Sequence, residues 1–512
     1  MTFKPSFTSQ LPKKTFLEGK NLKPFLEYET IAPSVEIPEI PHSIRNYHTN
    51  IIGNIGVGKS TLIAWWAFKD ILSGYGPVCV IDPKGDLVRD LMRVIPDDRI
   101  DDCIFVDIND PAPLDFMRCA PGNEDDVVHD LKFMLMGEAT DSVTYPFINK
   151  NIENLLFSLI DANKHPDLRK EEHRHLRCTF LDVAEFWEDE DRQKFIIDHI
   201  TNEKLRRTWK KLPSENDREK IIARINPFIR SSTLSKIFGD PNPRLDIDEI
   251  IRQNKILLVS VPVEKRGSAA YGKFLMAKIQ HAMFSVEDQS KRIPLFLYVD
   301  EFQNFPTSEN FHRVVDMGRG FLLCFTLSVT RLDLLTPSMI SALGIIGSYV
   351  VLQMNVNDRS FYEKKVCRDD PNKDLREKER QAAIDLQLCP PGDSRDRLQF
   401  KWNALQEMVK KLPPAPVSTE QLADLNKFQA IYKIGDAPSV IQPTPTPMSK
   451  ILTDREKQKV QTIIEQSKIY RSSYAESSTK RSGDNASSNT SQNPHTEGNG
   501  KKDEDIPGSG AV

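Results

Sequence analysis

The sequence lacks any long apolar run. Its longest apolar candidates, Phe321–Val329 and Leu343–Met354, are shorter than the roughly 18 residues that a membrane-spanning helix needs, and they fit buried strands. Residues 1–20 contain no apolar segment of the kind that a secretory signal peptide carries. We therefore expect a soluble protein with no direct membrane span, which would reach a membrane only through a partner.

Cysteine and net charge are also low. The chain has seven cysteines in 512 residues and no C-x-x-C pair, which argues against a disulfide framework or a structural zinc site and favours a reducing cytoplasm. The formal net charge is only −4, so the bulk charge does not indicate a nucleic-acid partner, and any contact with DNA must come from local basic patches. The length is sufficient for more than one domain.

One glycine-rich stretch fits the G-x-x-x-x-G-K-[ST] pattern of a phosphate-binding P-loop, and it consists of Gly53, Asn54, Ile55, Gly56, Val57, Gly58, Lys59, Ser60 and Thr61. A backbone wrapped around phosphates turns its amides inward, and glycine permits the positive φ angles that this requires. An apolar stretch precedes the loop and an apolar helix follows it. The pattern predicts ATP binding, with Lys59 on the β- and γ-phosphates and Ser60 as a ligand of Mg²⁺. The alternative is a glycine turn that caps an ordinary helix.

A second motif lies far downstream, where the apolar segment 293–299 ends in Asp300 and Glu301. After a P-loop, such a strand predicts that Asp300 holds Mg²⁺ through water and that Glu301 polarises the attacking water. A strand that ends in two acids is weak evidence alone, and the alternative is a purely structural strand end.

Short apolar strands alternate with helices in the first part of the chain. The strand within residues 76–86 ends in a polar turn that contains Asp82, Lys84 and Asp86. Because ligands collect at the carboxyl ends of parallel strands, we expect these three side chains on the nucleotide side. Together with a further strand at 102–108, the order is strand, P-loop helix, strand, helix, strand, which predicts an α/β fold with right-handed crossovers.

The pattern then becomes helical and rich in charge, which predicts an all-α domain inserted into the sheet. The expected helices are 126–135, 147–161, 179–187, 191–200, 203–211 and 216–229. Strands resume later, with the last expected edge strand at 428–434 and an extended linker at 443–447. A helix at 454–470 precedes a tail rich in Ser, Asn, Lys and Gly, which cannot bury a core and is predicted to be disordered.

Four stretches in this order resemble one known group of proteins. They are residues 47–60, residues 80–87, residues 298–305 and the strand that follows Arg319. The sequence is similar to the HerA/FtsK-type P-loop ATPases, and most similar to the coupling-protein ATPases of conjugation and type IV secretion (TraD/TraG type). The resemblance spans about residues 41–445 and includes a helical insertion in the matching place.

The resemblance implies a RecA-like ATPase domain in a hexameric ring, with ATP and Mg²⁺ bound between subunits and DNA, single- or double-stranded, threaded through the centre. It implies Arg319 as a catalytic arginine that reaches a neighbour's γ-phosphate, beside Lys59 and Glu301. Relaxase or secretion-channel proteins would be partners, and the location would be the cytoplasm, peripheral to the inner membrane through them. The glutamine that the family carries after its sensor strand is replaced by Thr330.

The predicted division of the chain follows from these features. Residues 1–45 are an extended segment, 46–122 and 239–445 the two parts of the RecA-like domain, 123–238 the inserted helical domain, 446–471 a linker and helix, and 472–512 the disordered tail. Coupling proteins usually carry N-terminal membrane helices, which this chain does not show, and HerA-type repair translocases carry a β-barrel, for which residues 1–45 are too few.

The favoured hypothesis is an ATP-driven DNA motor of conjugative transfer. A substrate-docking adaptor, in which ATP drives assembly on a secretion channel, is the alternative from a different class. A DNA-repair translocase of the HerA type is the third. Stimulation of the ATPase by DNA would distinguish motor from adaptor, and neighbouring genes would distinguish transfer from repair.

Overall fold

The computed structural model describes residues 37–115, 117, 122–136, 146–229, 232–265, 267–305, 311–413, 415–445 and 447–471. The expected disordered tail, residues 472–512, and most of the expected N-terminal segment lie outside these ranges.

A single sheet organises the described residues, with nine strands in the order β3-β4-β2-β5-β6-β1-β7-β8-β9. Strands β1 to β7 pair in parallel, whereas β8 and β9 are antiparallel. The strands are β1 Thr49–Ile52, β2 Val78–Asp82, β3 Cys103–Asp107, β4 Ile256–Ser260, β5 Leu295–Val299, β6 Leu323–Val329, β7 Ser348–Leu352, β8 Gln429–Lys433 and β9 Val440–Pro443. The fold class predicted from the sequence, an α/β sheet with an inserted helical part, is confirmed.

One expectation about the edge of the sheet is wrong. The strand at 428–434 exists as β8, but β9 pairs with its outer side, so β8 is not the edge. Pro443, which we assigned to an extended linker, is the last residue of β9. Proline lacks an N–H group, but an edge strand tolerates it because one side of the strand needs no hydrogen bonds.

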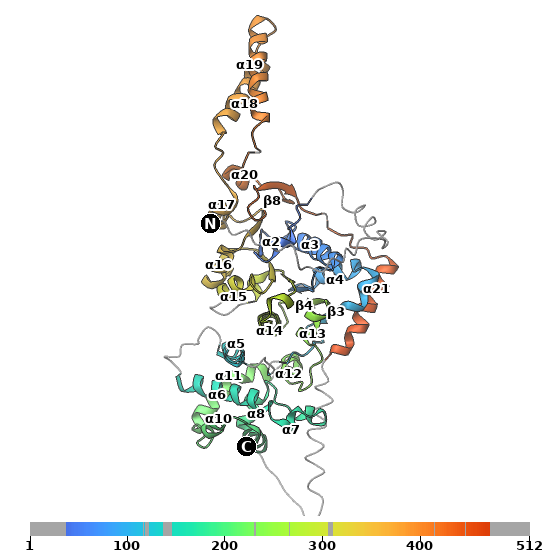
Figure 1. The fold of residues 1–512 in the computed structure, drawn as a ribbon, viewed down its shortest axis with the longest axis vertical. Coiled ribbons are helices and arrows are strands. Elements are labelled where there is room, and N and C mark those ends of the chain that lie inside the picture. Colours follow the sequence, from blue (N-terminus) through green and yellow to red (C-terminus); the bar gives the residue numbers. More distant parts are fainter. Residues whose placement is uncertain are drawn as a thin grey trace, which may run out of the picture.

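Helices cover both faces of the sheet, as a parallel sheet with apolar strands requires (Figure 1). On one face, α3 (Lys59–Ser73), α4 (Asp86–Val94) and α21 (Asp454–Ser467) share an apolar cluster with the strands. On the other face, α13 (Ile247–Arg252), α14 (Ser268–Phe284), α15 (Phe311–Gly318), α16 (Pro337–Gly344) and α17 (Arg359–Val366) share a second cluster.

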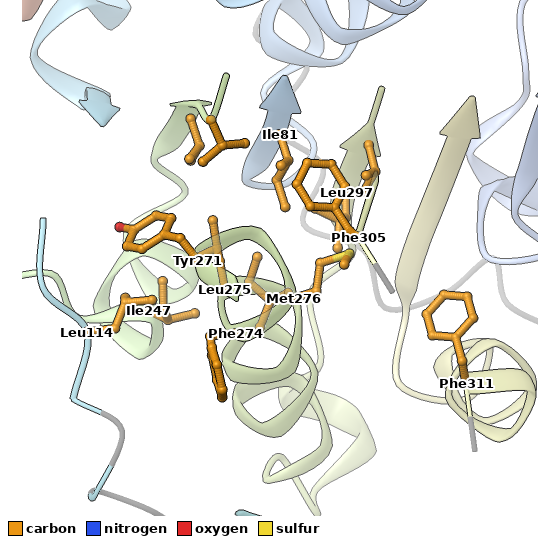
Figure 2. Close-up of a cluster of buried hydrophobic side chains, with 14 of the residues drawn as sticks. Ile81, Leu114, Ile247, Tyr271, Phe274, Leu275, Met276, Leu297, Phe305 and Phe311 are labelled. Atoms are coloured by element: carbon orange, nitrogen blue, oxygen red, sulfur yellow. The ribbon is translucent and has the colours of Figure 1, made fainter. Parts of the chain in front are cut away.

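Helix α14 packs against β2 and β5, the strands that end in Asp82 and in the Asp300–Glu301 pair. Figure 2 shows Tyr271, Leu275 and Met276 of α14 beneath the side chains of Ile81 in β2 and Leu297 in β5. Gly272 makes room for the loop after β5, because a Cβ atom at this position would lie 2.5 Å from the ring of Phe305. The buried helix therefore fixes the loop that follows Val299.

The inserted helical region connects two neighbouring strands, β3 and β4. Its entry and exit meet at a parallel bridge between Leu114 and Leu245. The helices are α5 Glu124–Met136, α6 Pro146–Ala162, α7 Pro166–Arg169, α8 Asp182–Glu188, α9 Glu190–His199, α10 Glu203–Thr208, α11 Glu215–Ile229 and α12 Ser232–Phe238. They bury aromatic side chains of their own, including Phe186 and Trp209, whose ring centroids lie 4.7 Å apart. The six helices predicted here are present, with shifted ends.

A helical hairpin, α18 (Lys373–Leu388) and α19 (Asp393–Lys410), projects from the sheet at the end of the molecule opposite the inserted helices (Figure 1). It carries exposed apolar side chains, with Leu388 79% and Phe400 78% exposed. Both helices are rich in charge, and among the described residues no helix is both long and apolar enough to cross a membrane.

Helix α21 closes the β3 edge of the sheet. The Ser467 hydroxyl accepts a hydrogen bond from the Phe105 amide of β3 at 2.8 Å, and Arg93 of α4 pairs with Glu456 at 2.9 Å. An uncovered strand edge is a template for pairing with other chains, so the helix protects this edge against aggregation.

A buried polar network ties the P-loop helix to the strand that ends in the two acids. The guanidinium of Arg45 donates to both oxygens of Asp70 in α3 at 2.7 Å and to the Tyr298 hydroxyl in β5 at 3.2 Å. Tyr298 in turn donates to Asp70. All three residues are at most 5% exposed.

We expect Asp70→Asn to destabilise the protein strongly, by about 3–5 kcal/mol, because it leaves the charge of Arg45 buried and unpaired. Tyr298→Phe is the matched control, since it removes one hydrogen bond and keeps the ion pair, at a cost of about 1 kcal/mol. Urea denaturation followed by tryptophan fluorescence would compare the two variants. Equal midpoints for the two would contradict the importance of the buried charge pair.

Candidate functional site

The P-loop connects the end of β1 to the start of α3, as the sequence predicts. Gly56 and Gly58 have φ angles of 76° and 110°, in the left-handed region that favours glycine. A Cβ atom at Gly58 would also lie 2.9 Å from the Thr444 hydroxyl oxygen, just beyond β9. The residue that follows the last strand, β9, therefore packs directly on the P-loop.

Lys59 folds back over this loop. Its ammonium donates to the carbonyls of Gly53 at 2.6 Å and Asn54 at 2.9 Å. Burial lowers the pKa of Lys59, although nearby Asp300 and Glu301 oppose that shift. A phosphate in the loop would offer this buried ammonium a stronger partner than two neutral carbonyls.

Ser60 and Asp300 meet across the gap between the P-loop and β5. The Ser60 hydroxyl donates to one oxygen of Asp300 at 2.7 Å. The other oxygen of Asp300 accepts from the Glu301 amide at 3.0 Å and from the Ser328 hydroxyl of β6. Hydroxyl and carboxylate oxygens are the donors that Mg²⁺ prefers, so this pair fits the ion that the motifs predict.

Glu301 adopts a left-handed backbone conformation, with φ 43° and ψ 54°. Such a conformation is costly for a residue other than glycine, and the surrounding structure must hold it in place. It turns the chain at the end of β5. One oxygen of the Glu301 side chain accepts a hydrogen bond from the Lys84 ammonium. The other oxygen accepts one from the side-chain amide of Asn304 at 3.3 Å.

The turn after β2 lies at the same edge of the sheet, as predicted. Asp82 is buried and accepts from the amides of Lys84 at 2.9 Å and Val88 at 3.2 Å. Burial, together with the nearby charge of Asp300, raises the pKa of Asp82 to about 6, although those hydrogen bonds oppose the shift. Asp86 is exposed as the first residue of α4.

The resemblance implies a glutamine at position 330, but this chain has a threonine there. The side-chain amide of a glutamine from another part of the chain, Gln303, lies beside Thr330. The side chain of Gln303, in the loop after β5, donates to the Thr330 hydroxyl at 3.3 Å and accepts from its amide at 3.4 Å. Neither Gln303 nor Ser328 was predicted from the sequence. Only their places in the sheet, at the ends of β5 and β6, bring them to the site.

Arg319 is far from its own P-loop in the topology. It precedes β6, whereas the P-loop follows β1, and all four residues of β1 pair in parallel with the last four residues of β6. Its guanidinium carbon lies 4.0 Å from the centroid of the Tyr47 ring, and Asn46 donates to its carbonyl at 3.1 Å. The structure thus brings Lys59, Ser60, Asp300 and Glu301 together at the carboxyl ends of the strands. Arg319 is exposed at the amino ends of the strands, on the opposite side of the sheet.

His48 fixes the segment that carries Arg319. Burial lowers the pKa of His48 to about 4, so the ring is neutral at physiological pH. Its Nδ1 atom accepts from the Phe325 amide at 3.2 Å, and its Nε2 atom then donates to the Val315 carbonyl at 2.6 Å. The turn between α15 and β6 is therefore held from both sides.

Comparison with solved structures identifies the fold. No protein-family model matches the sequence, and no curated protein matches it significantly. The bacterial conjugative coupling protein TrwBdeltaN70, in its trigonal form with sulphate, aligns with a TM-score of 0.52 and 14% identity over 83% of this chain and 90% of that chain. The chain has the fold of a conjugative coupling protein.

A second structure extends this similarity to a nucleotide complex. The plasmid coupling protein TrwB with ADP and Mg²⁺ aligns with a TM-score of 0.51 and 14% identity over 83% of this chain and 92% of that chain. The coupling-protein resemblance inferred from the motifs is thereby confirmed at the level of the fold.

Proposed function

We propose that this protein is an ATP-hydrolysing motor of the coupling-protein type that moves DNA. The observation that carries the proposal is the hydrogen bond from Ser60 to Asp300, which joins the two nucleotide motifs at one edge of the sheet. A glycine turn that merely capped a helix would need no acid from a distant strand. The coupling-protein fold supports the same conclusion.

Each residue has a distinct task in the proposed reaction. Lys59 binds the β- and γ-phosphates of ATP, and Ser60 and Asp300 hold Mg²⁺, which neutralises charge on the phosphates. Glu301 orients the water that attacks the γ-phosphate and accepts its proton. Positioning and charge neutralisation supply most of the catalysis in phosphoryl transfer.

We extend the proposal to the assembly. The chain would form a homo-hexameric ring in which Arg319 completes the site of the neighbouring subunit, with DNA in the centre. Residues 46–122 and 239–445 would form the ATPase domain and 123–238 a separate helical domain. The ring would act in the cytoplasm, at the inner membrane through channel or relaxase proteins.

DNA stimulation of the ATPase tests the motor. We expect the purified chain to hydrolyse ATP slowly alone and severalfold faster with double- or single-stranded DNA, because a translocase couples turnover to its track. Lys59→Ala gives the background, and heparin controls for a response to any polyanion. Equal rates with and without DNA would contradict the motor.

A substrate-docking adaptor is the second candidate, because the α18–α19 hairpin offers exposed apolar side chains to another protein. It predicts turnover that responds to a partner protein and not to DNA. Deleting residues 373–410 would then remove the response to that partner, whereas a DNA motor would keep its stimulation by DNA.

A further inference from the structure

Lys84 holds the residue to which we assign the catalytic base. Its ammonium forms an ion pair with one oxygen of Glu301, and the Lys84 side chain is 48% exposed while that of Glu301 is 15% exposed. Asn304 donates to the other oxygen. Each carboxylate oxygen could accept a further hydrogen bond, but the two contacts hold the group in one orientation, and a base must be able to turn toward the attacking water.

Lys84 comes from a different strand than the P-loop, although its ammonium is close enough to that of Lys59 to repel it. It follows β2, and the sheet order places β5 and β6 between β2 and β1. Lys84 therefore reaches Glu301 from the neighbouring strand, in the vicinity of Asp82 and Asp300. The backbone of Lys84 is fixed by its hydrogen bond to Asp82, so the ammonium can move only by changing its side-chain torsions.

We propose that Lys84 restrains Glu301 until a phosphate group captures the lysine ammonium and releases the carboxylate for catalysis. The inference rests on the proposed role of Glu301. Lys84 is in this account a positioning residue, since it acts through Glu301 and not on the reacting atoms. The phosphate would come from the backbone of bound nucleic acid or from a bound nucleotide.

The chemistry of the pair suits such an exchange. Partial burial works against the charge of Lys84, but contact with Glu301 outweighs this and raises the pKa of Lys84, so the side chain stays cationic. A partly exposed ion pair is weak. A phosphate carries more acceptor oxygens than a carboxylate and forms charge-assisted hydrogen bonds with lysine, so it can compete for the ammonium.

Lys84→Met tests the restraint, because it keeps the length of the side chain and removes its charge. We expect kcat for ATP without DNA to rise about two- to fivefold, the range for losing a partly exposed ion pair, with KM unchanged. Lys84→Arg should keep the low rate. Lys265→Met is the matched control, since Lys265 is an exposed lysine in the turn after the neighbouring strand β4, and its rate should not change.

Adding DNA separates the two phosphate sources. If DNA phosphates release Glu301, the fold-stimulation by DNA shrinks in Lys84→Met because the variant is already released. If the nucleotide releases it, the fold-stimulation stays that of the wild type while the rate without DNA is raised. Either result supports the restraint and assigns its trigger.

The double variant Lys84→Met/Glu301→Gln shows whether the gain passes through Glu301, and it should be as slow as Glu301→Gln. A correctly folded Lys84→Met with kcat at or below wild type, or a gain that survives in the double variant, would overturn the inference. Binding of a non-hydrolysable ATP analogue establishes folding, and Lys84→Gln serves if the methionine variant fails to fold. Normal turnover in Glu301→Gln alone would instead refute the proposed catalytic site.

Discussion

We expect Glu301→Gln to bind ATP with near wild-type affinity and to hydrolyse it about 10²- to 10⁴-fold more slowly. The amide keeps the size of the side chain but cannot accept a proton from water. The P-loop contacts of Lys59 and Ser60 are untouched. Steady-state ATPase rates and binding of a fluorescent ATP analogue measure the two effects separately.

Two variants give this experiment its controls. Lys59→Ala should lose affinity for the nucleotide itself, because it removes the ammonium that binds the phosphates, and so it fails at an earlier step than Glu301→Gln. Glu264→Gln changes an exposed acid in the turn after β4 and should behave like the wild type. Near-normal turnover in Glu301→Gln would remove this residue from the proposed mechanism.

Arg319→Ala should bind ATP almost normally and lose about 10³-fold in hydrolysis, the effect of removing an arginine finger. Binding survives because the P-loop of each subunit is intact, and Arg319 lies at the opposite edge of the sheet from it. Arg313→Ala changes an exposed arginine on α15, six residues before Arg319, and this control should retain activity. ATPase assays on the assembled protein measure both.

Mixed assemblies test whether Arg319 acts on a neighbouring subunit. Subunits with Arg319→Ala and subunits with Glu301→Gln are each expected to be inactive alone. In a mixed ring, the Arg319→Ala subunit still carries a normal Glu301, and the Glu301→Gln subunit still carries a normal Arg319. An interface formed by these two normal residues is complete, so some activity should return. Inactive mixtures in which mixed rings are shown to form, or full activity of Arg319→Ala alone, would contradict a role in trans.

Local motifs made the nucleotide residues predictable. The P-loop and the Asp300–Glu301 pair are each a short continuous motif. Each follows an apolar stretch that reads as a strand, which is enough to place both motifs at the carboxyl edge of a parallel sheet. The same logic correctly placed Asp82 and Lys84 at that edge. The positions of the longer helices, such as α6 and α14, could be predicted from the sequence, whereas the short helices α7 and α12 were not predicted.

Contacts between distant strands were not predictable from one sequence. Ser328 becomes a partner of Asp300 only because β6 lies between β5 and β1. Gln303 reaches Thr330 for the same reason. The ion pair between Lys84 and Glu301 joins residues 217 positions apart and depends on the pairing of β2 with β5. Strand β9 was not predicted, because its last residue, Pro443, indicates a linker as long as the pairing of the segment with β8 is unknown.

The bridge between Leu114 and Leu245 has a consequence for how such proteins can diversify. Because the chain leaves and re-enters the sheet at adjacent points, a short turn could in principle take the place of everything between them. The entropic cost of closing a loop rises only slowly with its length, so the insert can also grow at little expense to folding. Evolution could therefore exchange or enlarge the helical region, and with it whatever the region recognises, while the strand order that brings Ser60 to Asp300 stays the same.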